Sequence, residues 1–450
     1  MNVLESRGGR AWRRRPWVLL AGAVVVIAAV LFFTLNSTAP GHAGSSHSAI
    51  SSQSASDASH SASDPASASA AFTVRSTTPA AGAQNVAPDT TISVSFSAPV
   101  SAHTVTPVLA PDVAGKWVQT SATTLSYELD SPLIPSSQEL LTIPGGPHGL
   151  RASDGAVLAT SSSVAFGVAP GDTLRLQQLL AQLNFLPVAF VPSGPPPSRA
   201  DLAQDQPGTF SWRWPGLPTE LTAQWTQGTE NEITKAAVEA FETQNGLGVD
   251  GIAGPAVWTA LINDTINDKV DATPYVYVLV NKVVPQNLTL WDNGVAQYVG
   301  IPVNTGAPGA DTTDGTYAVF EHVRYSDMKG TNPDGSTYND PNVPYASYFN
   351  GGDALHGFIR ASYGSPQSNG CVEMSYADAA LVWPLTPIGT LVTVEGPDFG
   401  TAPPATTTTT TTPPQPAPTT TTAPPATTTT VAPAAPAPAA ATTTTAAPAG

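Results

Sequence analysis

The chain has 450 residues, which is enough for two or three domains, and 17 Lys and Arg residues against 33 Asp and Glu residues give it a formal net charge of -16. This acidic balance argues against a nucleic-acid partner, because such a partner needs a basic face for its phosphates. The single cysteine excludes an intramolecular disulfide, so in an exported protein the thiol is reactive, paired with another chain or buried.

The first 71 residues predict a membrane-targeting segment and a linker, and not a folded domain. Residues 1–16 hold a cluster of arginines, and residues 17–35 form an uncharged apolar run long enough to cross a hydrocarbon core of about 30 Å. We therefore expect a cytoplasmic segment over 1–16 and a transmembrane anchor over 17–35, with the rest of the chain outside the cell membrane. The alternative is a cleaved signal peptide and a secreted protein. Residues 36–71 are rich in Ser and Ala, which indicates a flexible linker.

Residues 72–169 alternate apolar and polar side chains in short runs separated by turn residues, which predicts a β-sandwich. The text TPAAGAQNVAPDTTISVSFSAPV at residues 78–100 resembles the opening of bacterial Ig-like domains. A role as a spacer is expected from that resemblance.

Residues 170–265 carry leucines and other apolar residues at helical spacing near both ends. The text AVEAFETQNGLGVDGIAGPAVWTALI resembles the repeat of peptidoglycan-binding domains, with Glu242 where that family usually has Gln. A polar, Pro-rich insertion at about 188–228 interrupts the match. The segment is therefore either a glycan-binding domain or a purely structural three-helix bundle.

Residues 273–396 predict a mainly β domain with one helix, Tyr376 to Trp383, after the cysteine. Asp292-Asn293-Gly294 is a strong β-hairpin signal. From residue 397 to 450 the chain is nearly all Thr, Pro and Ala, which predicts a disordered tail. The whole protein is thus expected to be multidomain and mainly β, with a small helical domain and disordered termini.

Two motifs in residues 273–396 point to chemistry, namely Leu355-His356-Gly357 and Ser368-Asn369-Gly370-Cys371. An imidazole near a thiol can accept its proton, and a helix start after the cysteine would lower the pKa of the thiol. The amides of Gly370 and Cys371 are candidates for an oxyanion hole, with Ser368 and Asn369 in the same loop. The chain shows neither the spacing of a metal site nor a phosphate-binding loop, so no metal or cofactor is expected.

These motifs, together with the preceding VNTG and DTTDGTYAVFE text, resemble the catalytic domain of the YkuD-type L,D-transpeptidases. The resemblance implies that Cys371 is the nucleophile, that His356 is the base, and that the carbonyl of Gly357 orients the imidazole. It also implies acyl transfer on peptidoglycan stem peptides through a thioester, giving 3→3 cross-links in the bacterial cell wall, a carboxypeptidase side reaction, and acylation by carbapenems.

Two positions depart from the family pattern, since Asn369 replaces a common His and Glu373 replaces a common Arg. Glu373 places recognition of a substrate carboxylate near the site in doubt, whereas Asn369 can still donate to an oxyanion or to substrate. Tyr345, Tyr348 and Arg360 are candidates for substrate contacts. The competing hypotheses are a non-catalytic wall-anchored binding or spacer protein and an enzyme that attaches another protein to peptidoglycan.

Overall fold

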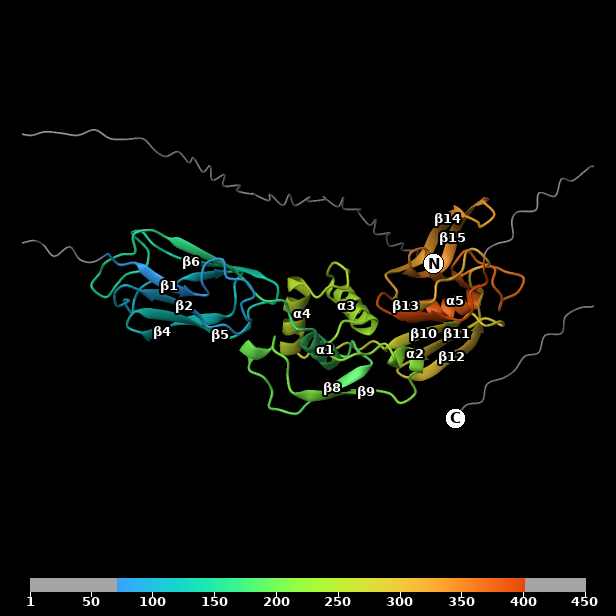
Figure 1. Cartoon of the computed structure of the whole chain (residues 1–450), viewed down its shortest axis with the longest axis horizontal. Helices are drawn as coiled ribbons and strands as arrows, with labels where there is room; N and C mark the ends of the chain where they lie inside the picture. Colours follow the sequence, from blue (N-terminus) through green and yellow to red (C-terminus); the bar gives the residue numbers. More distant parts are fainter. Residues whose placement is uncertain (1–70, 401–450) are drawn as a thin grey trace, which may run out of the picture. The chain divides into compact units, whose positions relative to one another are not determined.

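The structure, a computed structural model, describes residues 71–400 (Figure 1). The predicted segments 1–16 and 17–35, the linker up to residue 70 and the tail from residue 401 lie outside the described residues. None of the helices in residues 71–400 has the length and hydropathy of a membrane span.

The first folded segment is a β-sandwich, as its alternating sequence predicts. Its strands are β1 Val74–Thr78, β2 Ile92–Phe96, β3 Val108–Ala110, β4 Gly115–Ser121, β5 Thr124–Leu129, β6 Gln138–Ile143 and β7 Ser162–Gly167. They form two antiparallel sheets, in the orders β1-β2-β5-β4 and β3-β6-β7. Ile92, Val94 and Phe96 of the first sheet are buried with Leu141 and Phe166 of the second, so alternate side chains of both sheets fill one core.

The second folded segment contains the predicted helices. These are α1 Thr173–Gln182, α2 Thr219–Thr222, α3 Glu232–Asn245 and α4 Pro255–Ile266. Local signals set their ends: Asp172 and Asn231 cap α1 and α3 by accepting amide hydrogen bonds, and Pro255 begins α4. Gly246 ends α3 in the left-handed conformation, with φ of 65°.

The insertion at about 188–228 is folded, which its polar, Pro-rich sequence did not predict. It contains the hairpin strands β8 Val188–Pro192 and β9 Gly208–Trp212 and the short helix η1 Arg199–Asp201. Phe190 on β8 lies 5.1 Å from Phe210 on β9, and Phe210 lies 5.4 Å from Trp225, measured between ring centroids. All three rings pack against the helical core, so the insertion buries an aromatic face while exposing its polar residues.

Residues 276–395 form two further sheets and a helix (Figure 1). The first sheet has the order β12-β11-β10-β18-β13, and the second has the order β14-β15-β16-β17. The strands are β10 Val276–Asn281, β11 Asn287–Asp292, β12 Val295–Pro302, β13 Gly315–Ala318, β14 Glu321–Thr331, β15 Thr337–Asn350, β16 Asp353–Gly357, β17 Val372–Met374 and β18 Leu391–Glu395. Apolar residues of both sheets share one core, so the prediction of a mainly β domain is confirmed.

Local predictions in this domain are also confirmed. Asn293 and Gly294 both have positive φ in the turn between β11 and β12, which fits the Asp-Asn-Gly hairpin. The helix α5 spans Tyr376–Val382, and the hydroxyl of Ser375 accepts a hydrogen bond from its first turn. A short 3-10 helix, η2 Trp383–Leu385, follows it.

The hairpin arm, which we define as β14, β15 and the turn between them, projects from this domain (Figure 1). Its pairing runs from Glu321↔Tyr348 to Thr331↔Thr337. Next to it, β16 and β17 run parallel, and Leu355 is paired with Val372. This parallel pair brings the two sequence motifs together.

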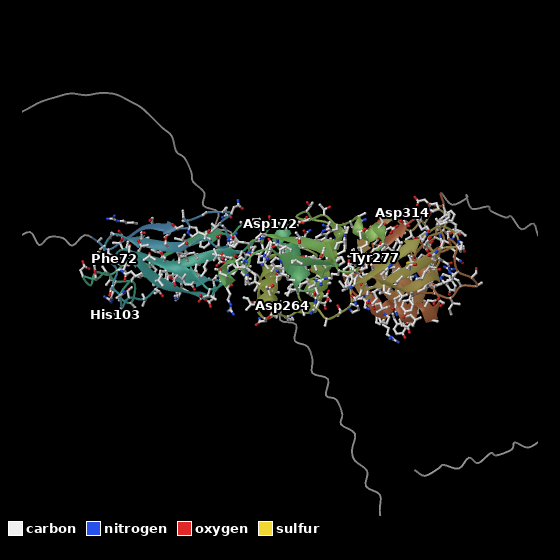
Figure 2. All side chains as sticks on the ribbon, turned by 90° about the horizontal axis from the view of Figure 1, so that it is seen from below. Phe72, His103, Asp172, Asp264, Tyr277 and Asp314 are labelled. Atoms are coloured by element: carbon white, nitrogen blue, oxygen red, sulfur yellow. The ribbon has the colours of Figure 1, made fainter. Side chains whose placement is uncertain are left out.

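The helical segment packs directly on the β domain of residues 276–395. Tyr277 on β10 and Leu391 on β18 belong to the same buried cluster as Phe241 of α3, and Tyr277 lies where the two segments meet (Figure 2). Gly389 allows this approach, because a Cβ there would lie 2.7 Å from the carbonyl oxygen of Ala236. The two segments therefore share a core.

The first residues of the predicted tail are held by the same β domain. The fully buried Lys282 ammonium lies 2.7 Å from a carboxylate oxygen of Asp314 and 2.6 Å from one of Asp398. The amide of Phe399 donates to Asp311 at 2.8 Å. A buried ammonium is stable only when carboxylates pair with it, and Asp398 is one of its two partners. Residue 398 therefore lies on the domain, although its Thr- and Pro-rich surroundings predicted that it belongs to the tail.

Candidate active site

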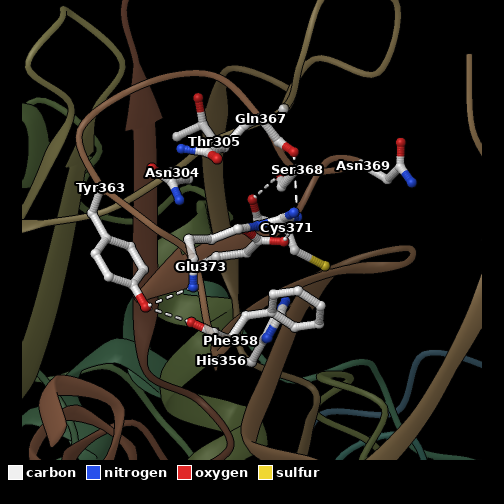
Figure 3. Close-up of polar contacts among 12 residues, drawn as sticks. Asn304, Thr305, His356, Phe358, Tyr363, Gln367, Ser368, Asn369, Cys371 and Glu373 are labelled. Carbon is white, nitrogen blue, oxygen red and sulfur yellow. Dashed lines mark hydrogen bonds and ion pairs between the residues drawn. The ribbon is translucent and has the colours of Figure 1, made fainter. Parts of the chain in front are cut away.

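Cys371 and His356 line the same cavity, which has a volume of about 240 Å³. Because Leu355 of β16 is paired with Val372 of β17, Cys371 lies beside the strand that carries His356. Within residues 71–400 no hydrogen bond joins the thiol to the imidazole; the sulfur instead donates to the carbonyl of Gly352 at 3.6 Å. Figure 3 shows the sulfur, the Phe358 ring and the imidazole grouped at this cavity.

The imidazole of His356 is fixed in one orientation. Only 2% of the residue is exposed, and its Nδ1 lies 3.1 Å from the carbonyl oxygen of Gly357. A carbonyl can only accept, so Nδ1 carries the proton and Nε2 is left as the acceptor. Burial lowers the pKa of His356, so the ring is neutral at pH 7 and can accept a proton.

The thiol of Cys371 is protonated in the resting protein. Burial raises its pKa to about 12, and the carboxylates of Asp353 and Glu373 act in the same direction. The expectation that a helix start lowers this pKa is wrong, because β17 separates the cysteine from α5. Charge and burial therefore keep the sulfur neutral until something else removes its proton.

The loop that carries Cys371 is held from several sides. Ser368 donates its hydroxyl hydrogen to the carbonyl of Cys371 at 2.6 Å, and Thr312 donates to the carbonyl of Gly370 at 2.6 Å. Gly370 has φ of 103°, and a Cβ at this position would overlap the carboxylate of Asp353. Only glycine fits here, and its place before the nucleophile sets the direction of the adjacent amides.

The departure at Asn369 has a structural role. Its side-chain amide donates to the side-chain oxygen of Asn332, in the turn of the hairpin arm. In the resting protein this amide is therefore engaged with the arm, and the contact fastens the arm to the nucleophile loop.

The departure at Glu373 is compensated by Arg360. Glu373 is 4% exposed, and both of its carboxylate oxygens accept from the Arg360 guanidinium at 2.7 Å. The guanidinium also lies 4.7 Å from the centre of the Phe358 ring. The hydroxyl of Tyr363 accepts from the Arg360 amide and donates to the Phe358 carbonyl (Figure 3). A guanidinium thus lines the cavity, but it comes from residue 360 and its charge is neutralised by Glu373.

The structure separates the three candidates for substrate contacts. Arg360 lines the cavity, whereas Tyr345 and Tyr348 do not. The Tyr345 ring lies 6.0 Å from the Trp383 ring, and the Tyr348 hydroxyl pairs with Ser326 at 2.8 Å. Both tyrosines thus pack within the domain.

Sequence reasoning missed the wall that the hairpin arm contributes. Four cavity residues come from the arm, and they are Met328, Asn332, Tyr338 and Asp340. Period-2 alternation puts residues 338 and 340 on one face of a strand, but only the pairing of β14 with β15 shows that this face meets the cysteine. Within residues 71–400 no group of three or more His, Cys, Asp or Glu side chains is placed to hold a metal ion.

A second cavity, of about 350 Å³, lies on the helical segment. Its lining includes Lys235 on α3 and the Gly-rich link around Asp250 and Ile252. Glu242 fixes this link, because one carboxylate oxygen accepts the amides of Asp250 and Gly251 at 3.0 and 2.9 Å. A glutamate serves here because its carboxylate accepts two amides.

Comparison with known proteins gives a family for each segment. The model of the L,D-transpeptidase catalytic domain matches residues 275–394, that of the bacterial Ig-like domain matches residues 68–167, and that of a peptidoglycan-binding domain matches residues 223–261. No curated protein matches the chain.

Several solved structures are similar to this chain. An L,D-transpeptidase from Mycobacterium smegmatis is 14% identical, with 72% of this chain and 99% of that chain covered and a TM-score of 0.26. L,D-transpeptidase 3 from Mycobacterium tuberculosis is 15% identical, with 72% and 99% covered and a TM-score of 0.25. The catalytic domain of an E. faecium L,D-transpeptidase is 22% identical over 28% of this chain and 100% of that chain, with a TM-score of 0.25. The segment at residues 275–394, which holds Cys371 and His356, thus matches the model of the L,D-transpeptidase catalytic domain.

Proposed function

We propose that this protein is an L,D-transpeptidase that cross-links peptidoglycan stem peptides through a thioester on Cys371. The observation that carries the proposal is the shared cavity of Cys371 and His356 inside a segment that matches the L,D-transpeptidase catalytic domain. The orientation of the imidazole supports it, because Nδ1 donates to Gly357 and leaves Nε2 free to act as a base.

In the first half-reaction, Cys371 Sγ attacks the carbonyl carbon of the third stem residue, a diamino acid. His356 Nε2 accepts the thiol proton and passes it to the departing nitrogen, so the C–N bond breaks and D-alanine leaves. The amides of Gly370 and Cys371 would donate to the oxyanion. In the second half-reaction a side-chain amine of a neighbouring stem attacks the thioester, giving a 3→3 cross-link and restoring the thiol. Attack by water gives the carboxypeptidase product.

The protonation states fit a base that acts during the attack. Burial lowers the pKa of His356 and raises that of Cys371 to about 12, so both groups are neutral at rest. The sulfur therefore loses its proton in step with the attack on the carbonyl carbon. At rest Sγ donates to the carbonyl of Gly352 and not to Nε2. The thiol therefore has to turn toward the imidazole before its proton can be transferred.

The raised pKa of Cys371 also favours the competing hypothesis, an inert wall-anchored spacer in which the cysteine is only a small buried side chain. Mass spectrometry of the purified full-length protein with a disaccharide-tetrapeptide separates the two. We expect an acyl-enzyme that has lost D-alanine, followed by a dimer and a tripeptide product. An unmodified protein and intact substrate after prolonged incubation would support the inert spacer.

Variants identify the groups involved. Cys371→Ala is expected to abolish the acyl-enzyme, and His356→Gln to slow its formation by about 100-fold or more, the usual size of general-base catalysis. The matched control is His103→Gln, which changes an exposed histidine of the Ig-like domain. Turnover that survives in Cys371→Ala would remove Cys371 from the mechanism.

Carbapenems supply a second probe of the same nucleophile. We propose that they acylate Cys371, as expected for an L,D-transpeptidase catalytic domain. Intact-mass measurement after carbapenem treatment should show an adduct in the wild type and none in Cys371→Ala. If both proteins stay unmodified, carbapenem sensitivity does not extend to this chain.

We further propose that residues 17–35 anchor the protein in the bacterial cell membrane with its folded segments outside, where peptidoglycan lies. Protease added to intact cells should then digest the catalytic domain, and the anchor should remain with the membrane fraction. A catalytic domain found only in the medium would favour the cleaved signal, and one protected in intact cells would contradict export.

The cavity of the helical segment is proposed to hold glycan. Ile252 lines it and is 66% exposed, so it offers an apolar surface to a sugar face. Ile252→Asp should weaken co-sedimentation of the full-length protein with insoluble peptidoglycan. Val249→Asp is the matched control, because Val249 is also exposed in the same link but does not line the cavity. Equal sedimentation of both variants and the wild type would favour a purely structural bundle.

Whether the acceptor is a stem or another protein is decided by the product. Purified wall material digested after the reaction should contain cross-linked stems. A protein attached to the stem in place of a second stem would support the protein-attaching enzyme.

A further inference from the structure

The cavity around Cys371 contains a carboxylate that the steps above do not use. Asp340 on β15 lines the cavity, and it is paired across the hairpin arm with Met328, which also lines it. Tyr338, two residues before Asp340, shares this face, and its hydroxyl would lie 2.8 Å from a Cβ added to Gly330. The absence of a side chain at Gly330 lets the tyrosine lie across the arm. This face of the arm therefore places Asp340 in the lining of the cavity that holds Cys371.

The other charges of the cavity cancel. Arg360 and Glu373 form a two-pronged ion pair at 2.7 Å, and a guanidinium nitrogen of Arg360 also donates to the Gln367 carbonyl at 3.3 Å. Asp340 takes part in none of the ion pairs found within residues 71–400. With Cys371 and His356 both neutral, the lining is left with one net negative charge.

The charge of Asp340 acts on the imidazole of His356. Burial lowers the pKa of His356, and the carboxylates of Glu373 and Asp340 oppose that shift. A carboxylate that acts on the imidazole will also act on a cation that approaches the same imidazole.

We propose that Asp340 selects a cationic primary amine, in preference to water, as the acceptor that resolves the Cys371 thioester. This inference rests on the acyl-transfer function proposed above and adds a determinant of acceptor choice. An ammonium group is attracted by the unpaired carboxylate and is concentrated beside the thioester, whereas water gains nothing from the charge. Asp340 is thus a specificity-determining residue of the second half-reaction.

The step balances in atoms and charge. The ammonium first releases one proton to solvent, and the neutral amine nitrogen then forms a bond to the thioester carbon. The C–S bond breaks as the tetrahedral adduct collapses, and the second proton passes from the nitrogen through His356 to the sulfur. The products are an amide, the neutral thiol and one proton in solvent, and Asp340 remains a carboxylate throughout.

The test measures how the acyl-enzyme partitions between amine and water. The full-length protein is acylated with disaccharide-tetrapeptide and given either a cationic amine acceptor or hydroxylamine, which is uncharged at neutral pH. Asp340→Asn should lower the ratio of aminolysis to hydrolysis about five- to tenfold for the cationic amine, as expected for one unscreened charge at a half-buried site. The ratio for hydroxylamine should stay within about twofold of the wild type, because an uncharged acceptor does not respond to the carboxylate.

Two further variants fix the interpretation. Asp340→Glu keeps the charge and should restore the ratio, and Asp327→Asn changes an exposed carboxylate of the same arm that does not line the cavity and should leave it unchanged. Formation of the acyl-enzyme by Asp340→Asn shows that the variant is folded.

Each remaining outcome counts against the proposal. If the ratio for the cationic amine is unchanged, or if both acceptors lose equally, Asp340 has no selective role. If the wild type acylates but yields only hydrolysis product, Asp340 does not recruit an amine, although the thioester mechanism stands. If the wild type forms no acyl-enzyme, the proposed function itself fails, and this inference fails with it.

Discussion

Thr312 offers a sharp test of how the nucleophile loop is held. Its side chain is fully buried, and its hydroxyl donates to the carbonyl of Gly370 at 2.6 Å while accepting the amide of Gly306 at 2.9 Å. Thr312→Val keeps the shape of the side chain and removes both hydrogen bonds. It leaves a buried carbonyl and a buried amide without partners.

The expected cost follows from those two groups. A buried polar group left without its partner costs about 1–3 kcal/mol, so the two groups together should cost the variant about 2–6 kcal/mol of folding free energy. The carbonyl of Gly370 belongs to the residue before Cys371, so the direction of the oxyanion amides is lost as well. We therefore expect acyl-enzyme formation to slow by about tenfold or more, which is less than the roughly 100- to 1000-fold cost of removing an oxyanion donor because the amides are misdirected and not lost.

The assay combines equilibrium unfolding in urea with the rate of acylation by disaccharide-tetrapeptide. Thr312→Ser is the matched control, because it keeps the hydroxyl and removes only a methyl group, at a cost of about 1 kcal/mol. If Thr312→Val unfolds and acylates like Thr312→Ser, the hydroxyl does not hold the loop and the reasoning is refuted.

Three further substitutions test the charges of the site and the shared core. Asp353→Asn removes a negative charge near the sulfur, so the pKa of the Cys371 thiol should fall from about 12. Alkylation by iodoacetamide at pH 9 should then rise about three- to tenfold. An unchanged pH profile of alkylation contradicts the charge effect. Glu373→Gln leaves Arg360, which is 30% exposed, without a counter-ion and should cost about 1–3 kcal/mol of unfolding free energy in urea. Part of this loss should be recovered when Arg360→Gln is added. If the losses of the two single variants simply add in the double variant, the ion pair does not stabilise the site. Gly389→Ala should cost about 1–3 kcal/mol of unfolding free energy, because its φ is +86° and the added Cβ meets α3. The control Gly351→Ala, with φ of +54° and open space around the added Cβ, should cost about 1 kcal/mol. Equal losses in the two variants contradict close packing between the segments.

Short-range signals carried most of the fold. The alternation Ile92, Val94, Phe96 predicted one face of the sandwich, and Asn293-Gly294 predicted the turn between β11 and β12. The end of α3 at Gly246 and the start of α5 after Ser375 depend only on local backbone conformation and nearby hydrogen bonds. Turns and helix ends of this kind depend only on a few adjacent residues, so the sequence alone determines them.

Composition was a poorer guide where a few residues decide the outcome. The insertion reads as polar on average, yet Phe190 and Phe210 are enough to pack a hairpin against the helices. In the same way Asp398, at the start of a Thr- and Pro-rich tail, is held by one buried lysine. Averages over a window cannot show which single side chain has a distant partner.

The sequence by itself determined which residues carry the proposed chemistry, because His356 and Cys371 stand in short motifs whose residue types have few other uses. Only the tertiary structure decided the charge around them. The pairing of Arg360 with Glu373, the contact of Asn369 with Asn332, and the place of Asp340 in the lining of the cavity all depend on strand register. Electrostatic energy depends on distance in space, and residues far apart along the chain acquire that distance only when the chain folds.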